Sequence, residues 1–393
     1  MPNTTTSKPG RKAGRPHKDF PLFPHQNGRW CKKVKGVHRY FGKVSSDPKG
    51  EAALVLWLAQ KDALLAGRAP QVNPKGVTVR QVVNSFLTHK KAIMEAGELT
   101  DRTFQEYYAT AARLVKAFGP TRPINDLIGD DFRRLRTQIA KQWGPIRLGN
   151  EIQRVRSVFK YGYDSGLLDK PVRFGPDFKK PSAKVLRQNR AKAGLRMFEA
   201  AEVRAMLAVA GPNMRAMILL GLNCGLGNSD VAGLTFSAVN LKTGWLDYPR
   251  PKTGVARRIP LWPETVEAVK TAIGQRTTPK DSAHKNLVFV GLRGKSYLSS
   301  DAKNANGYRV GNEFARTLTS AKVKPKRGFY CIRHTFQTIG EGANDLVAVQ
   351  AVMGHAPSGS DMSAQYRERI DDSRLVAVVG HVRKWLFDLE ENE

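Results

Sequence analysis

The sequence has few cysteines and no pattern that would bind a metal through them. Three occur in 393 residues, at Cys31, Cys224 and Cys331, and none belongs to a CxxC motif or a Cys/His metal spacing. Disulfide-rich and zinc-stabilised proteins show closely spaced cysteines. We therefore expect no disulfide framework and no metal site, and three reduced, structural thiols.

Long apolar runs are also missing. No uninterrupted apolar stretch reaches the length of a bilayer span, and the N-terminus lacks the apolar core of a signal peptide. The sequence accordingly predicts a soluble, cytoplasmic protein without a membrane segment.

Acidic residues are scarce. The chain has 65 Lys and Arg against 34 Asp and Glu, which gives a formal net charge of +31 and a pI of about 10.3. So large an imbalance predicts a polyanionic partner, and nucleic acid is the first candidate. An anionic membrane surface is the competing interpretation. DNA as partner would place the protein at the nucleoid.

The N-terminal region concentrates this charge, with 11 Lys and Arg and a single acid, Asp19, in residues 1–46. Residues 1–20 are polar and rich in Pro and Gly, which predicts a disordered basic tail. Arg15, in Ala-Gly-Arg-Pro, is weakly similar to an AT-hook core, although Arg-rich tails are common and generic charge is the favoured interpretation.

Residues 21–73 predict a small β-sheet followed by a helix over about 47–65. Short aromatic and β-branched runs are broken by Asn-Gly and Lys-Gly pairs, which is typical of hairpins. Lys32 and Lys33 on this sheet are candidate DNA contacts. The aromatic residues of the sheet either dock on DNA or form its core: Trp30, Tyr40 and Phe41.

Residues 74–178 predict an all-helical domain. Val79, Val82, Val83 and Phe86 form the apolar stripe of a helix capped by Thr78, and three more helices follow. The fourth carries four cations outside its apolar stripe, which either contact phosphates or form a solvated face: Arg147, Arg154, Arg156 and Lys160. Residues 179–196 are basic and lack periodicity, which predicts a linker.

Residues 197–393 mix helices with strands expected in GWLDYPRPKTGVARRIPL. A final apolar stripe, from Leu375 to Leu389, marks a last helix. Five motifs follow in order: CGLGNSDVAGL, PKTGVARRIPL, YCIRHTF, VMGH and SAQYRERI. Each is weak alone, because Gly-His pairs and Lys-Thr-Gly turns are common. Together, in this order and spacing, they resemble the catalytic domain of the tyrosine recombinases, or phage integrases.

The resemblance covers almost the whole chain. The helical region is similar to the family's core-binding (SAM-like) domain, and the basic N-terminal region resembles the arm-binding modules of some integrases. It implies a multidomain, mainly α protein with an α+β catalytic domain, which clamps duplex DNA between the helical and catalytic domains. By the same resemblance we expect a monomer without DNA and a tetramer on synapsed DNA, with the C-terminal helix docked on a neighbouring protomer or packed on its own domain. DNA-bending accessory proteins are further partners that the resemblance admits.

DNA cleavage without a metal needs a nucleophile, stabilisation of charge on the nonbridging phosphate oxygens and a proton for the leaving 5′ oxygen. The resemblance assigns these roles residue by residue. Tyr366 is the nucleophile, forming a 3′-phosphotyrosyl intermediate with no cofactor. Arg333 matches the second family arginine, Lys252 the hairpin lysine that serves as general acid, and His355 the position that supports the phosphate.

Two positions depart from the family pattern. Gly227 stands where the first catalytic arginine is expected, so half of the phosphate clamp is missing. Tyr330 stands where a histidine is usual; its hydroxyl keeps a hydrogen-bond donor but accepts protons poorly at neutral pH. For the arginine missing at position 227, loss of one preorganised donor to the transition state costs roughly a hundred- to a thousandfold in rate.

Two residues are candidates to replace the missing arginine. Arg250 lies two positions before Lys252 on a predicted strand, so both side chains should share a face. Asn228 is a neutral alternative, and both could simply support the fold. The favoured function is a site-specific recombinase for DNA integration or excision. The alternatives are an impaired relative that regulates its binding sites, and an enzyme that relaxes DNA by the same chemistry.

Overall fold

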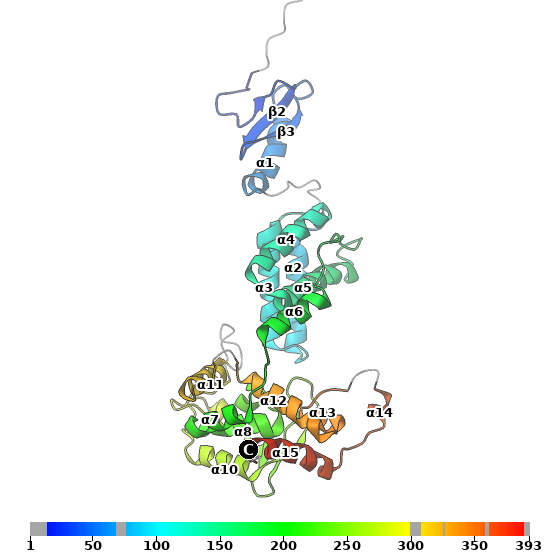
Figure 1. The fold of residues 1–393 in the computed structure, drawn as a ribbon. Coiled ribbons are helices and arrows are strands. Elements are labelled where there is room, and N and C mark those ends of the chain that lie inside the picture. The colour runs from blue at the N-terminus through cyan, green and yellow to red at the C-terminus, as the bar shows by residue number, and fades with distance from the viewer. Residues whose placement is uncertain (1–13, 68–75, 299–307, 325–326, 358–360, 389–393) are drawn as a thin grey trace, which may run out of the picture. The chain divides into compact units, whose positions relative to one another are not determined.

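The computed structural model describes residues 14–67, 76–298, 308–324, 327–357 and 361–388. The chain divides into two units, residues 1–192 and 193–393. Figure 1 shows the first with a small sheet and a helical bundle, and the second as mainly helical. Most of the predicted basic tail, residues 1–13, lies outside the described residues.

The sheet of the first unit is antiparallel in the order β1-β2-β3, with β1 at Phe23–Pro24, β2 at Arg29–Val34 and β3 at Val37–Lys43. Lys35 and Gly36, both with positive φ, form the tight turn between β2 and β3. Helix α1, Glu51–Leu65, covers one face. The predicted sheet and helix are thus confirmed, although the helix begins later than expected.

The aromatic residues of this sheet divide between core and surface. Trp30 is fully buried and donates from Nε1 to the Asp47 carbonyl at 2.7 Å, and Phe41 is buried beside Trp57. Tyr40 is exposed. Phe20, one residue before the predicted start of this domain, also belongs to the core.

The helical bundle follows the predicted apolar stripes. Its elements are α2 at Val79–Glu95, α3 at Asp101–Phe118, the short η1 at Ile124–Asp126, α4 at Gly129–Gln142 and α5 at Pro145–Asp164. The Thr78 cap is confirmed, with Gln81 N donating to its hydroxyl. The core is rich in phenylalanine, including Phe86, Phe118, Phe132, Phe159 and Phe178.

The predicted linker contains helix α6, Ala183–Ala193. None of its residues is buried, which explains the missing hydrophobic period. Ala, Leu, Lys, Arg and Gln are strong helix formers even without an apolar face to bury, and they dominate this stretch.

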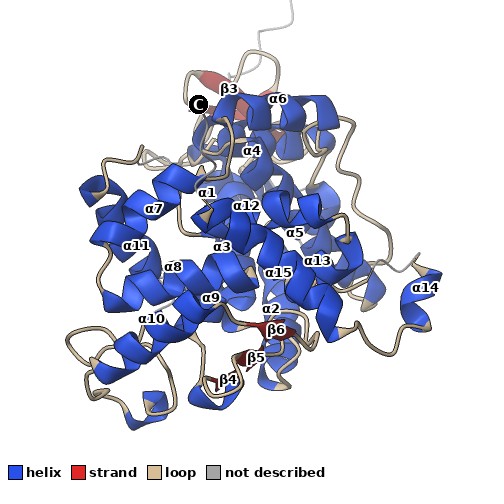
Figure 2. Cartoon of the chain, turned by 60° about the horizontal axis from the view of Figure 1, so that its bottom comes forward, coloured by secondary structure: helices blue, strands red, loops and turns tan. Residues whose placement is uncertain are grey.

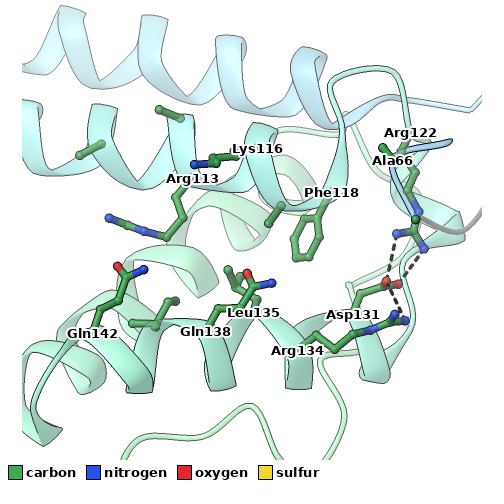
Figure 3. A pocket seen from close by; sticks show the side chains of 15 residues that line it. Ala66, Arg113, Lys116, Phe118, Arg122, Asp131, Arg134, Leu135, Gln138 and Gln142 are labelled. Atoms are coloured by element: carbon green, nitrogen blue, oxygen red, sulfur yellow. Dashed lines mark hydrogen bonds and ion pairs between the residues drawn. The ribbon is translucent and has the colours of Figure 1, made fainter. Parts of the chain in front are cut away.

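A buried ion pair joins α4 to the segment after α3. Arg122 and Asp131 are both buried, and Arg122 Nη2 lies 2.7 Å from Asp131 Oδ2. Arg122 Nη2 also donates to the Asp126 carbonyl at 2.7 Å. Figure 3 shows this pair at one end of a hollow lined by α3 and α4. The hollow also carries Arg113 and Lys116.

The second unit is built around α8, Pro212–Cys224, which is almost wholly buried. Around it lie α7 at Ala200–Val209, α10 at Pro263–Gly274, α11 at Tyr308–Ser320, α12 at Tyr330–Gly340 and α15 at Asp372–Phe387. The short helices are α9 at Asn228–Ala232, α13 at Leu346–Val352 and α14 at Met362–Gln365, with η2 at Phe236–Ala238, η3 at Ser282–His284 and η4 at Glu341–Ala343.

A second small sheet lies at the edge of this unit, as Figure 2 shows. It is antiparallel in the order β4-β5-β6, with β4 at Val239–Asn240, β5 at Trp245–Asp247 and β6 at Arg258–Pro260. The mixed α and β character predicted for residues 197–393 is confirmed.

Helix α15 packs on its own unit. Leu375, Val378, Val379, Val382 and Leu386 are buried in the same core as α8. Of the two possibilities left open for the C-terminal stripe, the structure therefore shows packing within the protomer. Leu389 lies outside the described residues.

Within the described ranges, the helices are too short or too polar to cross a bilayer.

The Arg122–Asp131 pair gives a stability prediction. Arg122→Ala leaves the buried Asp131 carboxylate with only one cation, the exposed Arg134, whose Nη2 lies 3.7 Å from Oδ1, so we expect unfolding to become easier by about 3 kcal/mol. Urea unfolding of the full chain, followed by circular dichroism, measures this. Arg133→Ala, which breaks the solvent-exposed pair with Asp130, is the matched control and should leave the transition unchanged. Equal transitions for both variants would contradict a role for the buried pair.

Candidate functional site

Arg333 is the centre of the candidate site. It lies on α12 and is only 2% exposed. Its guanidinium donates to the Gly225 carbonyl and, at 2.8 Å, to the Met353 carbonyl. These carbonyls follow the C-terminal ends of α8 and α13. The free carbonyls and negative dipole ends of two helices therefore hold one buried cation.

His355 follows the same helix end. Helix α13 stops because Gly354 adopts a left-handed conformation with φ +61°, and the His355 amide closes the turn on the Gln350 carbonyl at 2.9 Å. The half-buried imidazole then lies with Nε2 3.1 Å from Nη2 of Arg333. The Gly-His motif thus sets the position of the ring beside the guanidinium.

Arg250 reaches the same place from a hairpin. Its Nη1 donates to the Gly354 carbonyl at 3.2 Å, and the Thr253 hydroxyl donates to the same oxygen at 3.2 Å. The Arg250 amide bonds to the Val255 carbonyl at 2.8 Å, which closes the hairpin turn. One backbone carbonyl therefore fixes the Arg250 side chain next to His355.

The electrostatics of these three groups favour an anion. Burial, and next the nearby charge of Arg250, lower the pKa of Arg333 to about 10. Burial, then Arg333 and Arg250, also lower the pKa of His355, which keeps its imidazole neutral near pH 7. Neither arginine forms an ion pair with a carboxylate of the described residues. A bound phosphate would relieve this uncompensated positive charge.

Lys252 lies at the tip of the hairpin and is exposed. Residues 251–253 form a turn between β5 and β6, so the prediction that Arg250 and Lys252 share a face of one strand was wrong. Pro251, which has no amide hydrogen, and Gly254, with φ +70°, break the extended backbone that this prediction required. Arg250 is held at the site by the Gly354 carbonyl, whereas Lys252 is exposed in the turn.

The two positions that depart from the family pattern touch each other. Gly227 has φ −93°, a conformation open to any residue, and a Cβ built there would lie 3.3 Å from Cε2 of Tyr330. Asn228, the neutral candidate for the missing donor, begins α9 and is half-buried. The ring of Tyr330 therefore covers the point at which a side chain at 227 would leave the backbone.

A buried carboxylate behind this contact is held by an arginine that the sequence reasoning missed. Asp230 accepts from the Gly227 amide at 2.9 Å, and its other oxygen lies 3.5 Å from Nη2 of Arg257. Arg257 is 2% exposed, and its Nε donates to the Tyr248 carbonyl at 2.8 Å. A basic residue in so basic a sequence resembles a surface charge. The one sequence feature that could have indicated its burial is its position directly before strand β6, where side chains alternate between the two faces.

Among the described residues, the Tyr366 side chain makes no hydrogen bond to Arg250, Arg333 or His355. Tyr366 caps α14, and its side chain is 80% exposed. Figures 1 and 2 both show α14 at the periphery of the second unit. Its neighbours Ala364 and Arg367 nevertheless line the same groove as Val255, Arg257 and His355. The tyrosine therefore belongs to a segment that borders the site.

The cations predicted to contact DNA differ in their surroundings. Arg154 forms ion pairs with Glu106 and Glu151, and Arg156 donates to the Phe178 carbonyl at 2.7 Å. Lys160 pairs with Asp164 at 2.7 Å. These three are held by partners within the bundle, which the sequence did not foresee.

The other predicted DNA contacts are more open. Arg147 is exposed and lies with Cζ 3.9 Å from the Trp143 ring centroid, and Lys33 is exposed on β2. Lys32 lies 5.7 Å from the Trp57 ring, and Arg15 lies 6.0 Å from that of Phe23. Their contact with DNA stays a prediction.

Known solved structures share this architecture. Lambda integrase, as a tetramer bound to a Holliday junction, matches with a TM-score of 0.55 at 14% identity, over 91% of this chain and 99% of that one. The Tn1549 transposon integrase, in complex with transposon right end DNA, matches with a TM-score of 0.55 at 17% identity, over 78% of this chain and 100% of that one. The chain therefore has an integrase fold.

One stretch of the sequence also matches a family model. Residues 196–370 match the model of the phage integrase family. This range contains the site built from Arg250, Arg333 and His355. Among curated proteins, none matches the sequence of the chain.

The turn that holds Arg250 and His355 gives the second prediction. Gly354→Ala would place a Cβ 2.7 Å from Cδ of Arg257 in a left-handed backbone, so we expect a loss of about 1–3 kcal/mol in stability. Urea unfolding measures the loss, and hydrogen exchange should localise it to α12 and α13.

Gly380→Ala is the control, because Gly380 lies inside α15 with open space around its Cα. That change should stabilise the helix by about 0.5–1 kcal/mol. If both alanine variants unfolded alike, the turn would not depend on glycine.

Proposed function

We propose that the protein is a site-specific tyrosine recombinase that cleaves and rejoins duplex DNA through a 3′-phosphotyrosyl intermediate. The observation that carries the proposal is the convergence of Arg333, Arg250 and His355 on one turn, with no carboxylate of the described residues paired to either arginine. The match of residues 196–370 to the phage integrase family supports the reaction type.

In this proposal the scissile phosphate binds where these three side chains meet. Arg333 supplies a preorganised guanidinium, because the helix-end carbonyls leave it no freedom to turn. Arg250 supplies the second guanidinium in place of the arginine missing at 227, and the neutral His355 donates a hydrogen bond. Such fixed donors stabilise the charge that grows on the nonbridging oxygens in the transition state.

The covalent step balances without a cofactor. The Tyr366 oxygen attacks phosphorus and loses its proton to water, and the bond from phosphorus to the 5′ oxygen breaks. Lys252 gives a proton to that leaving oxygen. The reverse attack by a 5′ hydroxyl restores the diester. Because Tyr366 is exposed, DNA binding has to bring α14 against the site before attack.

The solved integrases support the choice of partners. Lambda integrase was captured as a dimer on a COC′ core site and as a tetramer on a Holliday junction. We infer that this chain likewise acts on duplex DNA in a complex with copies of itself, at the nucleoid of the cytoplasm. Accessory proteins that bend DNA would assist the assembly, and the first unit would add DNA contacts through Arg147, Arg15, Lys32 and Lys33.

Covalent capture tests the proposal. The probe is a nicked duplex carrying sequence that flanks the coding region, chosen by gel shift, so that cleavage releases a short strand and traps the adduct. Wild type should form a covalent complex, and Tyr366→Phe should form none. Arg333→Ala and Arg250→Ala should each slow adduct formation at least a hundredfold, since each removes a charged donor.

The control is Arg316→Ala, an exposed residue of α11, which should cleave at the wild-type rate. Sequence-specific binding without an adduct would instead identify the protein as a DNA-binding regulator. An adduct that survives Tyr366→Phe would disprove the assignment of the nucleophile.

A sulfur substitution tests the role of Lys252. If the 5′ bridging oxygen of the probe is replaced by sulfur, the leaving group is a thiol, which departs without a general acid because its pKa is much lower than that of an alcohol. Lys252→Ala should therefore cleave the normal probe roughly a hundredfold more slowly and the sulfur probe at the wild-type rate. A defect of equal size on both probes would show that Lys252 does not donate the proton.

A further inference from the structure

The contact between Gly227 and Tyr330 has a chemical consequence. The two ring atoms of Tyr330 nearest to a Cβ at position 227 would lie 3.3 and 3.4 Å away, closer than ordinary contact. A side chain at 227 would require this ring to shift by a few tenths of an ångström. The side chain at 227 and the ring of Tyr330 thus compete for the same space.

The hydroxyl of Tyr330 is available to a ligand. The side chain begins α12 and is 49% exposed, and no described residue hydrogen-bonds to its oxygen. The ring is held on one side by Gly227 and on another by an edge contact with His334, whose ring centroid is 5.4 Å away. A fixed ring with a free hydroxyl is a preorganised donor.

The surroundings of Tyr330 are cationic. The residue lines a hollow with Arg196, Lys324 and His334; Glu199 and Glu202 line it too, and Glu202 pairs with Arg327, so the net positive charge comes from Arg196 and Lys324. It also lies one helical turn before Arg333, whose guanidinium is near enough to interact with the phenol electrostatically. DNA bound at Arg333 and His355 would bring phosphate oxygens into this positively charged region.

The carboxylate next to Gly227 is already satisfied. Asp230 receives the Gly227 amide on one oxygen and Arg257 on the other. Arg257, buried from the hairpin side, supplies the cation that pairs with this acid.

We propose that Tyr330 replaces part of the missing arginine: its ring fills the path from position 227, and its hydroxyl donates a hydrogen bond to a nonbridging oxygen of the scissile phosphate. This inference rests on the proposed recombinase function. A hydroxyl bonded to a charged phosphate oxygen makes a short, strong hydrogen bond, although it brings no charge of its own. Arg250 supplies the positive charge, and Tyr330 supplies a hydrogen bond to the phosphate from a second side.

Removal of the hydroxyl tests the proposal. Tyr330→Phe should slow adduct formation on the nicked probe about a hundredfold, as loss of one oxyanion donor does. Gel shifts should show unchanged DNA binding, and circular dichroism an unchanged unfolding transition. Tyr108→Phe, an exposed tyrosine of α3, is the matched control and should cleave like wild type.

A modified phosphate separates a catalytic hydroxyl from a structural one. In the two methylphosphonate diastereomers of the probe, one or the other nonbridging oxygen is replaced by a methyl group. On the diastereomer that lacks the oxygen bound by Tyr330, wild type and Tyr330→Phe should react at the same rate. On the other diastereomer the difference should remain. A defect of equal size on both diastereomers would assign Tyr330 a packing role and overturn the proposal.

A double-mutant cycle tests the shared space. Gly227→Arg with Tyr330 in place should gain little or lose activity, and combined with Tyr330→His it should exceed both single variants by at least tenfold. Additive effects would refute the coupling. If wild type itself forms no adduct, the recombinase function fails. If wild type reacts through Tyr366 and Tyr330→Phe is equally fast, only this inference fails.

Discussion

The burial of one guanidinium between two helix ends is the constraint on which the site depends. Arg333 is held by the carbonyls of Gly225 and Met353, at the C-termini of α8 and α13. Both helix ends need a donor and the cation needs acceptors, so the contacts that satisfy the helix ends also position the guanidinium of the site. His355, one turn past α13, and Gly227, two residues past Gly225, take their places from this arrangement.

In our account the site is complete without an arginine at 227 because three neighbours share its tasks. Arg257 from the hairpin neutralises Asp230, the ring of Tyr330 fills the space beside Gly227, and Arg250 brings a second guanidinium to the turn at Gly354. Two of these three come from the loop between β5 and β6. In our account the hairpin contributes both the general acid, Lys252, and the charge that the helix has lost.

Motif order and helical periodicity predict much of this molecule. The spacing of apolar residues predicts the stripe from Val79 to Phe86, with its Thr78 cap, and the buried face of α15. The motifs around Arg333 and His355 predict two residues that the structure brings together. The prediction that Arg250 and Lys252 share a face is wrong because the alternation of side chains requires a continuous strand, which Pro251 interrupts. Other features depend on contacts between segments far apart in the sequence, which a local pattern does not predict. They are the ion pair of Arg154 with Glu106, the burial of Arg257 and the contact between Gly227 and Tyr330.

The most direct test of the account is a structure of the protein on cleaved DNA with orthovanadate, which joins a tyrosine oxygen and a DNA hydroxyl in the geometry of the transition state. The account predicts vanadium bonded to Tyr366, with Arg333 and Arg250 on its nonbridging oxygens and the Tyr330 hydroxyl on one of them. Vanadate bound to Tyr366 with water in place of the Arg250 guanidinium would contradict it.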